Sequence, residues 1–355
     1  MKIFLAATSL ASAYGGPARS VARLAESLAD EDDVGLWSAD GSRPSPASGR
    51  LRWLPGALDS AFGAFGTPDV IHDNGIWLPH NHCLAVRARS LSIARVVSTR
   101  GMLEPWARSH KAIRKALAWA GYQRRDLARA GCLHATASSE AANLLKLGLN
   151  VDIRTIPNGV DVPPPMGATA SQRVRRQRIA LFLGRICPIK GLEMLVRAWS
   201  IARPAGWILR IAGPDEAGHR AVVEHEVAAA GLAQAVEFIG TVDDSFKTRV
   251  FHSADILVLP SYSESFGMSA AEALAHGVPV LATRGTPWSS LIEHSCGWWV
   301  DTTEQGLSEG LREVAATSAE ELLAMGSRGR DYVASELGWS SVARRFRQLY
   351  AELMT

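Results

Sequence analysis

The sequence has few cysteines and no long apolar run, and both shortages exclude classes of protein. Every apolar run is shorter than the stretch of about 20 residues that a helix needs to cross a bilayer. The first run, Lys2 to Thr8, is interpreted as a buried strand and not as part of a signal peptide, because Gly15 and Gly16 lead into a helical pattern. The cysteines are far apart, show no metal-binding spacing and are expected to be buried thiols in a reducing cytoplasm: Cys83, Cys132, Cys187 and Cys296.

A strong excess of one charge and metal-ligand spacing are also missing. The formal net charge is +3, divided into +5 over residues 1–170 and −2 over residues 171–355. The basic bias of the first part favours an anionic partner there, but it is too weak to indicate a nucleic-acid-binding protein. The 10 histidines show no H-x3-H spacing, so the sequence predicts no bound metal.

The first half of the chain contains a regular alternation of short apolar runs and amphipathic segments. Strands are predicted at Lys2–Thr8, Val34–Ala39, Leu51–Leu54, Asp69–His72, Arg95–Thr99, Cys132–Ala137 and Ile153–Pro157. Helices are predicted at Pro17–Leu28, Asn81–Leu91, His110–Arg129 and Ser139–Leu147. This alternation is typical of an α/β domain built on a doubly wound parallel sheet.

The same pattern restarts after Asp161 to Gln177, an irregular segment with three consecutive prolines that is predicted to be a linker. Strands are predicted at Ile179–Leu183, Ile208–Ala212, Val236–Ile239, Ile256–Pro260, Val280–Thr283 and Trp298–Val300. Helices are predicted at Gly191–Ile201, His219–Ala229, Ser245–His252, Phe266–Ala275, Ser318–Glu336 and Ser340–Glu352. Because 355 residues are enough for two cores, we expect two α/β domains.

The stretch from Ser261 to Val280 carries the most specific signal. It follows a predicted buried strand and reads as a short loop and a helix. Such a loop lies at the carboxyl end of a parallel strand, where open α/β sheets bind ligands. The helix N-terminus near Gly267 offers unpaired N–H groups to a phosphate. The carboxylates of Glu264 and Glu272 can accept hydrogen bonds from sugar hydroxyls.

Glu264 and Glu272 are separated by seven residues, with the strings SFGM and EALAHGVPV around them. This stretch resembles the E-x7-E signature of the retaining GT-B glycosyltransferases of family GT4. The resemblance implies two Rossmann-like doubly wound parallel-sheet domains that face a cleft. It implies an N-terminal acceptor-binding domain over residues 1–163, a linker over 164–177 and a C-terminal donor-binding domain over 178–338. Residues 339–355 are expected to form a helix that crosses back to the first domain.

Two cations lie in the loop after the first strand of the second domain. Arg185 and Lys190 stand beside Gly184 and Gly191, and two cations in one such loop fit a diphosphate better than a solvated surface. The resemblance to GT4 gives this loop, Gly184 included, the same role toward the donor diphosphate. Because the leaving diphosphate gains negative charge as the glycosidic bond breaks, Arg185 and Lys190 are predicted to be catalytic.

The resemblance implies the other donor contacts. Glu264 is expected to lie at the donor sugar as a catalytic residue, and Glu272 is expected to bind the ribose hydroxyls. Further donor contacts are expected at Gly15, Gly16, Ile239, Gly240, Phe266, Gly267 and Met268. No carboxylate is clearly placed as a covalent nucleophile, so front-face return assisted by the leaving phosphate is expected.

Acceptor contacts are expected at loops and strand ends of the first domain. Tyr14 lies in the glycine-containing loop, and His72, Asp73 and Asn74 end one of the predicted strands. Many GT4 members carry a histidine where this chain has Arg100. Two alternatives follow: Arg100 replaces that histidine, or His72 or Asp73 takes its part.

The segment His110–Arg129 shows two faces at helical spacing. The basic face comprises Lys111, Lys115, Arg125 and Arg129. The apolar face comprises Ile113, Ala116, Leu117, Ala120 and Leu127. The basic face is either a solvated surface or a patch that attracts anionic lipid headgroups.

Together these features predict a retaining glycosyltransferase that moves a hexose from a UDP- or GDP-sugar to a hydroxyl of a glycan, with no cofactor. The acceptor is expected to be linked to a lipid carrier, in bacterial exopolysaccharide, lipopolysaccharide or O-antigen assembly. The protein would then act in the cytoplasm, at the cytoplasmic face of the inner membrane. Two alternatives stay open: a GT-B sugar-nucleotide epimerase, and a non-catalytic protein that binds nucleotide sugars.

Overall fold

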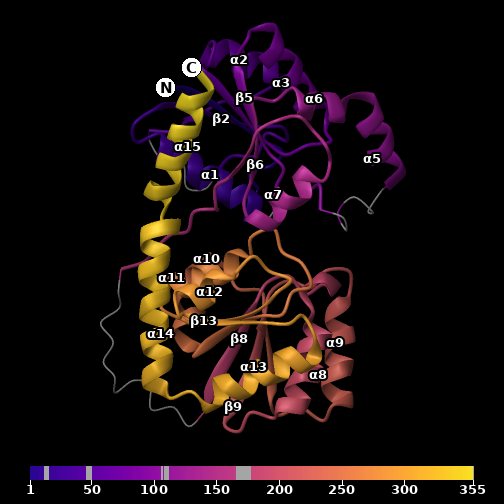
Figure 1. Cartoon of the computed structure of the whole chain (residues 1–355), viewed down its shortest axis with the longest axis vertical. Coiled ribbons are helices and arrows are strands. Elements are labelled where there is room, and N and C mark those ends of the chain that lie inside the picture. The colour runs from indigo at the N-terminus through magenta and orange to yellow at the C-terminus, as the bar shows by residue number, and fades with distance from the viewer. Residues whose placement is uncertain (12–15, 45–49, 105–106, 108–111, 165–176, 355) are drawn as a thin grey trace. The chain divides into compact units, whose positions relative to one another are not determined.

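The chain forms two compact units, seen here in a computed structural model (Figure 1). The structure describes residues 1–354 except 12–15, 45–49, 105–106, 108–111 and 165–176. Unit 1 consists of Met1–Gly159 and Trp339–Thr355, and unit 2 of Val160–Gly338. Within the described ranges, no helix is both long enough and apolar enough to span a membrane.

Unit 1 is built on a parallel sheet with the strand order β3-β2-β1-β4-β5-β6-β7. The strands are β1 Lys2–Ala7, β2 Asp33–Ser38, β3 Arg52–Trp53, β4 Val70–Asn74, β5 Ala94–Ser98, β6 Cys132–Ala135 and β7 Ile153–Thr155. Its helical segments are α1 Gly16–Leu28, α2 Leu58–Phe65, α3 Pro79–Ser90, α5 Ala112–Ala118, η2 Trp119–Gln123, α6 Arg124–Ala128, α7 Ser138–Leu145 and α15 Trp339–Met354. Since every strand pair is parallel, the loops that follow the strands leave from one edge of the sheet.

The strand register brings polar side chains together near that edge. Ala7 at the end of β1 pairs with Asn74 at the end of β4, and Asn74 pairs with Ser98 of β5. Ser98 in turn pairs with His134 of β6. Residues at or next to the ends of four neighbouring strands therefore lie side by side.

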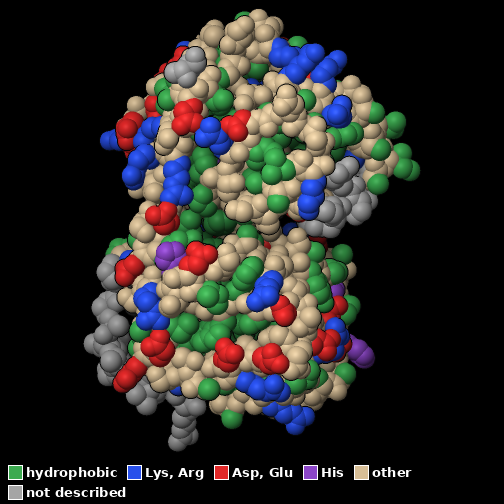
Figure 2. Space-filling view, in the orientation of Figure 1, with side chains coloured by type: hydrophobic (Ala, Val, Ile, Leu, Met, Phe, Trp, Pro, Cys, Tyr) green, Lys and Arg blue, Asp and Glu red, His purple; other side chains and the backbone are tan. Residues whose placement is uncertain are grey.

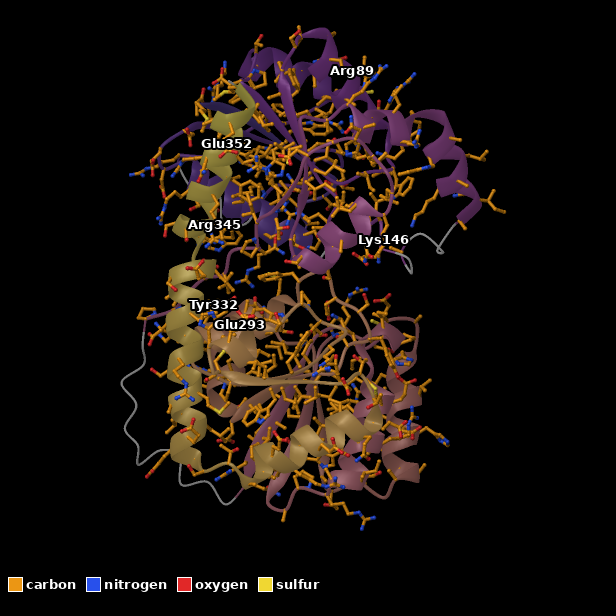
Figure 3. The ribbon with its side chains drawn as sticks, viewed as in Figure 1. Arg89, Lys146, Glu293, Tyr332, Arg345 and Glu352 are labelled. Atoms are coloured by element: carbon orange, nitrogen blue, oxygen red, sulfur yellow. The ribbon has the colours of Figure 1, made fainter. Side chains whose placement is uncertain are left out.

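Helix α15 completes the core of unit 1, although it follows unit 2 in the sequence. Its apolar side chains recur at helical spacing and are buried with those of α1 and the central strands: Val342, Ala343, Phe346, Leu349 and Tyr350. Its opposite face carries polar residues, and Figure 3 labels Arg345 and Glu352 on this helix. The amphipathic pattern thus explains why α15 packs onto the sheet.

Unit 2 has a parallel sheet with the order β10-β9-β8-β11-β12-β13. The strands are β8 Arg178–Leu183, β9 Trp207–Ala212, β10 Val236–Gly240, β11 Ile256–Leu259, β12 Val280–Thr283 and β13 Gly297–Val300. The helical segments are η4 Pro188–Lys190, α8 Leu192–Ala202, α9 His219–Ala229, α10 Asp244–Ser253, α11 Met268–Ala275, α12 Ser290–Glu293, α13 Glu304–Ala316, α14 Ala319–Tyr332 and η5 Val333–Leu337.

The sheet of unit 2 is buried on both faces. Along β8, Ala180 and Phe182 belong to the core shared with α8, α9 and α13, whereas Leu181 and Leu183 belong to the core shared with α10 and α11. Successive side chains of a strand point to opposite faces, so a continuous apolar run is needed to bury both. This requirement explains why the central strands of unit 2 contain unbroken apolar runs such as Ile179–Leu183 and Ile256–Leu259.

Each strand predicted from the sequence is present, with ends within two residues of the predicted ones. Helices α2, α12 and α13 were not predicted. Helix α13 has a capping signal, since the Thr303 side chain accepts a hydrogen bond from the Gly306 N–H at 3.0 Å. Gly306 and Gly310 weaken its helical pattern, but Gly310 lets the helix approach β12, where a Cβ would lie 2.8 Å from Leu281.

The helix predicted over His110–Arg129 is present in the described residues from Ala112 to Ala128, but it is not regular. The described part is divided into α5, the π-helical turn η2 and α6. A π turn closes hydrogen bonds over five residues instead of four, so the side chains after it turn to a different face. As a result Leu127 is buried, whereas Ile113 and Leu117, expected on the same apolar face, are 80% and 70% exposed.

Candidate active site

The candidate active site of unit 2 lies where β8 and β11 end. Leu181 of β8 pairs with Leu257 of β11, so the loops that follow these two strands leave the sheet next to each other. The β8 loop carries Gly184, Arg185 and Lys190, and the β11 loop carries Glu264 and leads into α11.

Gly191 allows the two loops to touch. Its φ of +67° lies in the left-handed region, and a Cβ at this position would lie 2.3 Å from the carbonyl oxygen of Pro260. The Tyr262 N–H donates to the Ile189 carbonyl at 2.9 Å, which fixes the β11 loop against η4. This contact places Lys190, the last residue of η4, beside Glu264.

Lys190 and Glu264 form an ion pair that is largely shielded from solvent. The Lys190 ammonium donates to Glu264 Oε1, and the Ser261 hydroxyl donates to the same oxygen at 2.8 Å. The two side chains are only 17% and 12% exposed. An anion that attracted the Lys190 ammonium would free Glu264 to accept a hydrogen bond from a hydroxyl, so the pair couples anion binding to hydroxyl binding.

The amino end of α11 presents unused backbone donors next to this pair. Gly267 has a φ of +83°, and a Cβ there would lie 3.0 Å from both Leu259 and the Trp288 indole nitrogen. Trp288 donates to the Phe266 carbonyl at 2.7 Å and holds the turn. Within the described residues, no acceptor takes a hydrogen bond from the N–H groups of Phe266, Gly267 or Met268. Three free donors at a helix N-terminus favour an anion.

Glu272 occupies the next turns of α11 and has a partner that the sequence did not reveal. Lys247 of α10 donates to Glu272 Oε1 at 2.6 Å, and the Glu272 side chain is 10% exposed. No local pattern links the two positions, because they lie 25 residues apart on different helices. A second cation–carboxylate pair therefore links α10 to α11, the helix that follows the Glu264 loop.

The other donor residues of the prediction lie at the same edge but are more exposed. Arg185 pairs with Glu216, and these side chains are 57% and 49% exposed. Gly240 ends β10, where its carbonyl accepts from the Gly213 N–H at 2.8 Å, and the neighbouring Ile239 is 41% exposed. Because β9 and β8 separate β10 from β11, this part of the edge lies two strands away from Glu264.

In unit 1, His72 belongs to a buried chain of hydrogen bonds. Its Nδ1 lies 2.6 Å from the Tyr350 hydroxyl, and its Nε2 lies 2.7 Å from Ser98 Oγ. Ser98 Oγ lies 2.6 Å from His134 Nδ1, and His134 Nε2 lies 2.7 Å from the Ile156 carbonyl. Since that carbonyl can only accept, His134 carries its proton on Nε2, and the chain has one direction from Tyr350 to Ile156.

The same chain keeps both histidines neutral. Burial lowers the pKa of His72 well below its usual value and lowers that of His134 to about 4. Both rings have every nitrogen engaged by protein atoms, and both residues are at most 1% exposed. The prediction that His72 binds the acceptor was therefore wrong, because no donor or acceptor of its ring is free.

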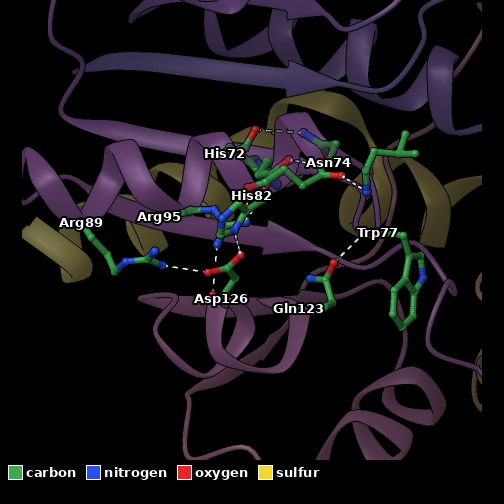
Figure 4. Close-up of polar contacts among 11 residues, drawn as sticks. His72, Asn74, Trp77, His82, Arg89, Arg95, Gln123 and Asp126 are labelled. Carbon is green, nitrogen blue, oxygen red and sulfur yellow. Dashed lines mark hydrogen bonds and ion pairs between the residues drawn. The ribbon is translucent and has the colours of Figure 1, made fainter. Parts of the chain in front are cut away.

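Asp73 is likewise part of the core and not an acceptor contact. Arg95 pairs with Asp73 Oδ2 at 2.7 Å, and the Asn81 amide donates to Oδ1 at 2.8 Å. Arg95 also donates to the backbone carbonyl of Asp126, whose carboxylate binds Arg89 and His82 (Figure 4). This network ties β4, β5, α3 and α6 together. It shows that a polar residue at a strand end, such as Asp73, can serve the core of the unit instead of binding a ligand.

Arg100 and Asn74 are the predicted acceptor residues that stay at the edge of the sheet. Arg100 donates to Asn74 Oδ1 at 2.7 Å and remains partly exposed. Gly16 is exposed at the start of α1. Tyr14 and Gly15 lie outside the described residues.

The predicted basic patch is not a continuous face. Lys115 donates to the Ala107 carbonyl and lies over the Trp77 ring at 5.8 Å, so it points back toward the unit. Arg125 and Arg129 are exposed, and Lys111 lies outside the described residues. Apolar side chains of this segment are exposed as well, namely Ile113 and Leu117, and Figure 2 shows hydrophobic side chains standing out over α5.

No group of three or more histidine, cysteine or carboxylate side chains that could hold a metal ion is present in the part of the chain that the structure describes. Cys132, Cys187 and Cys296 are buried thiols as predicted, but the prediction was wrong for Cys83, which is exposed on α3. Burial raises the pKa of Cys132 to about 12 and that of Cys296 to about 11.

Comparison with known families gives a match for each unit. Residues 14–163 match the sequence model described as Glycosyltransferase Family 4, and residues 169–332 match the model described as Glycosyl transferases group 1. A D-inositol 3-phosphate glycosyltransferase of Corynebacterium aurimucosum is 26% identical over 245 residues, which is 62% of this chain and 54% of that protein. One of Nocardia farcinica is 35% identical over 175 residues, 45% of this chain and 39% of that protein. The chain spans about half, or less, of the length of these curated relatives.

Solved structures share the whole fold at low sequence identity. Sucrose-phosphate synthase from Thermosynechococcus elongatus aligns with a TM-score of 0.78 and 22% identity over 99% of both chains. Anabaena HepE, solved with UDP and glucose, aligns with a TM-score of 0.75 and 16% identity over 99% of this chain and 100% of HepE. WaaG, described as a glycosyltransferase involved in lipopolysaccharide biosynthesis, aligns with a TM-score of 0.67 and 15% identity over 98% of this chain and 99% of WaaG.

Proposed function

This chain belongs to glycosyltransferase family 4 and has the GT-B fold, and from that premise we propose that it transfers a hexose, with retention, from a nucleotide diphosphate sugar. The acceptor in this proposal is a hydroxyl of a glycan linked to a lipid carrier, in bacterial polysaccharide assembly. The donor is a UDP- or GDP-sugar. UDP and glucose in the HepE structure support the uridine nucleotide as the first to be tested.

One observation carries the proposal: unit 2 gathers an ion pair, three free backbone donors and a second ion pair at one sheet edge. The Lys190 ammonium and the N–H groups at the start of α11 suit the diphosphate. Glu264, once released from Lys190, suits a sugar hydroxyl, and Glu272 suits the ribose.

The same residues explain how bond cleavage would be favoured. As the bond between sugar and diphosphate breaks, negative charge grows on the leaving phosphate, and Lys190 and Arg185 meet it. Donors that are already oriented stabilise such charge more in the transition state than in the ground state. Glu264 holds the sugar while its anomeric carbon is attacked from the face that the diphosphate leaves.

Exposed apolar side chains suggest how a lipid-linked acceptor would be reached. Ile113 and Leu117 project from α5, which buries none of its side chains, and Arg125 and Arg129 are exposed nearby in sequence. Apolar side chains beside cations suit an anionic membrane surface. Co-sedimentation with anionic vesicles should therefore be lost in Ile113→Glu/Leu117→Glu, whereas Arg52→Gln, an exposed cation on β3, serves as a matched control.

The proposal is tested by a panel of nucleotide sugars. A ligand that binds only the folded state raises its stability, so the donor should give the largest thermal shift. The stereochemistry of the product, read by NMR at the anomeric proton, then tests retention. Failure of every UDP- and GDP-sugar to shift the melting temperature would contradict the donor assignment.

Product analysis separates the two alternatives. An epimerase would release free sugar and nucleotide without an acceptor, and a non-catalytic protein would bind the donor and leave it intact. We expect neither result, because the charged residues that suit transfer are all present in unit 2.

A further inference from the structure

Arg100 is a cation of unit 1 whose direct hydrogen-bond partners are all neutral. It follows β5 with a φ of +51°, in the left-handed region that non-glycine residues seldom adopt. Its guanidinium donates to Asn158 Oδ1 at 2.6 Å, Asn74 Oδ1 at 2.7 Å and Ser20 Oγ at 3.2 Å. All three partners are neutral, so they orient the guanidinium without balancing its charge.

No carboxylate of the described residues forms an ion pair with Arg100. Glu140 is the acid that acts most strongly on it, but both Glu140 oxygens are already occupied. Thr99 and the Gly101 N–H donate to Oε1 at 2.6 and 2.7 Å, and the N–H and hydroxyl of Thr136 both donate to Oε2 at 2.8 Å. Burial lowers the pKa of Arg100 to about 10, but the side chain still carries its charge at neutral pH.

Unused hydrogen-bond donors lie at the same sheet edge. Arg100 Nε is buried without a partner among the described residues, and so is the hydroxyl of Thr8, which follows β1. Ser20 lies on α1, and the first turn of this helix contains no acidic residue that would balance the positive end of the helix dipole. A largely shielded charge normally forms an ion pair, and within the described residues Arg100 forms none, although Glu140 acts on it electrostatically.

We propose that Arg100 binds an anionic group, a phosphate or a carboxylate, on the acceptor that unit 1 receives. The planar guanidinium suits either oxyanion, since both accept two parallel hydrogen bonds. Arg100 would thereby select acidic acceptors over neutral ones. The inference rests on the proposed function only in taking unit 1 as the acceptor-binding unit.

Binding of three small probes tests the proposal: methyl glucoside, methyl glucuronide and glucose 6-phosphate. They are titrated by calorimetry against protein saturated with UDP, so that phosphate cannot enter the nucleotide site. We expect at least one of the two anionic probes to bind about tenfold or more tightly than methyl glucoside, because hydrogen bonds to charged groups are among the strongest. The pair of anionic probes distinguishes a phosphate from a carboxylate. Equal affinity for all three probes would overturn the proposal.

Two variants locate the site. Arg100→His removes the permanent cation and should abolish the preference. Asn158→Asp has nearly the same shape and supplies an internal counter-charge 2.6 Å from the guanidinium, so it should fold at least as stably as the wild type yet lose the anion. A preference that survives in Asn158→Asp would show that Arg100 only ties α1 to β4, and this second variant answers the question even if Arg100→His fails to fold.

Matched controls separate this inference from the proposed function. Arg52→Gln removes an exposed cation of unit 1 at the start of β3 and should keep the preference. Lys190→Ala should weaken the binding of UDP. If methyl glucuronide is the anionic probe that the wild type prefers, this variant should keep that preference when the affinity is measured without UDP. If UDP fails to bind the wild type while the anionic preference persists, the donor assignment fails and the anion site stands.

Discussion

The two sheets end in polar side chains, but the two units use them in opposite ways. In unit 1, Tyr350, His72, Ser98 and His134 form a neutral chain that is closed to solvent. In unit 2, Lys190 pairs with Glu264 at a partly open edge, next to unpaired backbone donors. Polar residues at strand ends can therefore belong to a closed core network, as in unit 1, or keep their charge at an edge that solvent partly reaches, as in unit 2.

The largest effect should come from breaking the charged edge of unit 2. In Lys190→Ala the leaving diphosphate loses one oriented cation, and turnover should fall about 10²–10³-fold, with a smaller change in donor affinity. Steady-state kinetics with the donor found in the nucleotide-sugar panel measures both quantities. Near-normal turnover would remove Lys190 from the catalytic role.

A second test sharpens the division of labour inside unit 2. Glu272→Ala should weaken UDP alone by about 10–100-fold, since hydrogen bonds from ribose hydroxyls to a carboxylate are lost. Glu264→Gln should leave UDP affinity nearly unchanged, because Glu264 is assigned to the sugar. Calorimetry with UDP compares the two variants, and equal losses would mean that the roles are wrongly divided.

The third test breaks the closed edge of unit 1. Tyr350→Phe removes the hydroxyl that donates to His72 Nδ1 and leaves a buried acceptor unpaired, which should cost about 1–3 kcal/mol of unfolding free energy. UDP affinity should not change, because unit 2 keeps its side chains. Urea unfolding measures the loss of unfolding free energy, and hydrogen exchange of the amides in β4 and β5 shows whether it falls in unit 1. A stability equal to that of the wild type would contradict the role given to the chain.

The two neutral histidines should make unit 1 sensitive to acid. Their folded pKa values lie below the ordinary 6.5, so the unfolded state takes up protons first as the pH falls. Stability is complete above about pH 6.5 and should be lost toward the folded pKa of His134, about 4, at roughly 1 kcal/mol per pH unit for each histidine. Hydrogen exchange of β5 compared with β8 from pH 7 to pH 5 tests this, and equal protection in both strands would count against it.

The smallest expected effect is that of a chelator. We predict that EDTA leaves turnover unchanged, because the cationic loop and the start of α11 are assigned the charge that a metal would otherwise supply. Loss of activity in EDTA that Mg²⁺ or Mn²⁺ restores would falsify this assignment.

The fold was largely readable from the sequence because its signals are local. Apolar runs such as Ile256–Leu259, and the loop and helix that follow it, depend on residues that are neighbours in the chain. The partners of the polar side chains at the strand ends and on α11 are not local. His72 meets Tyr350 across 278 positions, and Lys247 meets Glu272 across 25.

Two further errors show what periodicity alone does not contain. The apolar residues of His110–Arg129 follow one helical period in the sequence, but the π turn at Trp119–Gln123 divides them between exposed and buried faces. Asp73 ends a strand as a ligand-binding residue would, but Arg95 and Asn81 engage its carboxylate inside the unit. In both cases the deciding contact is tertiary.

The position of α15 in the chain also has a consequence for the order of folding. A ribosome completes Met1–Gly159 first, but the core of this segment lacks Phe346 and Leu349, and His72 lacks its donor, until residues 339–354 have emerged. Unit 2 is continuous in sequence, so it can reach its final packing while unit 1 still exposes an apolar groove. Met1–Gly159 is thus made before unit 2 but completes its packing only after the last residue of unit 2 has been made.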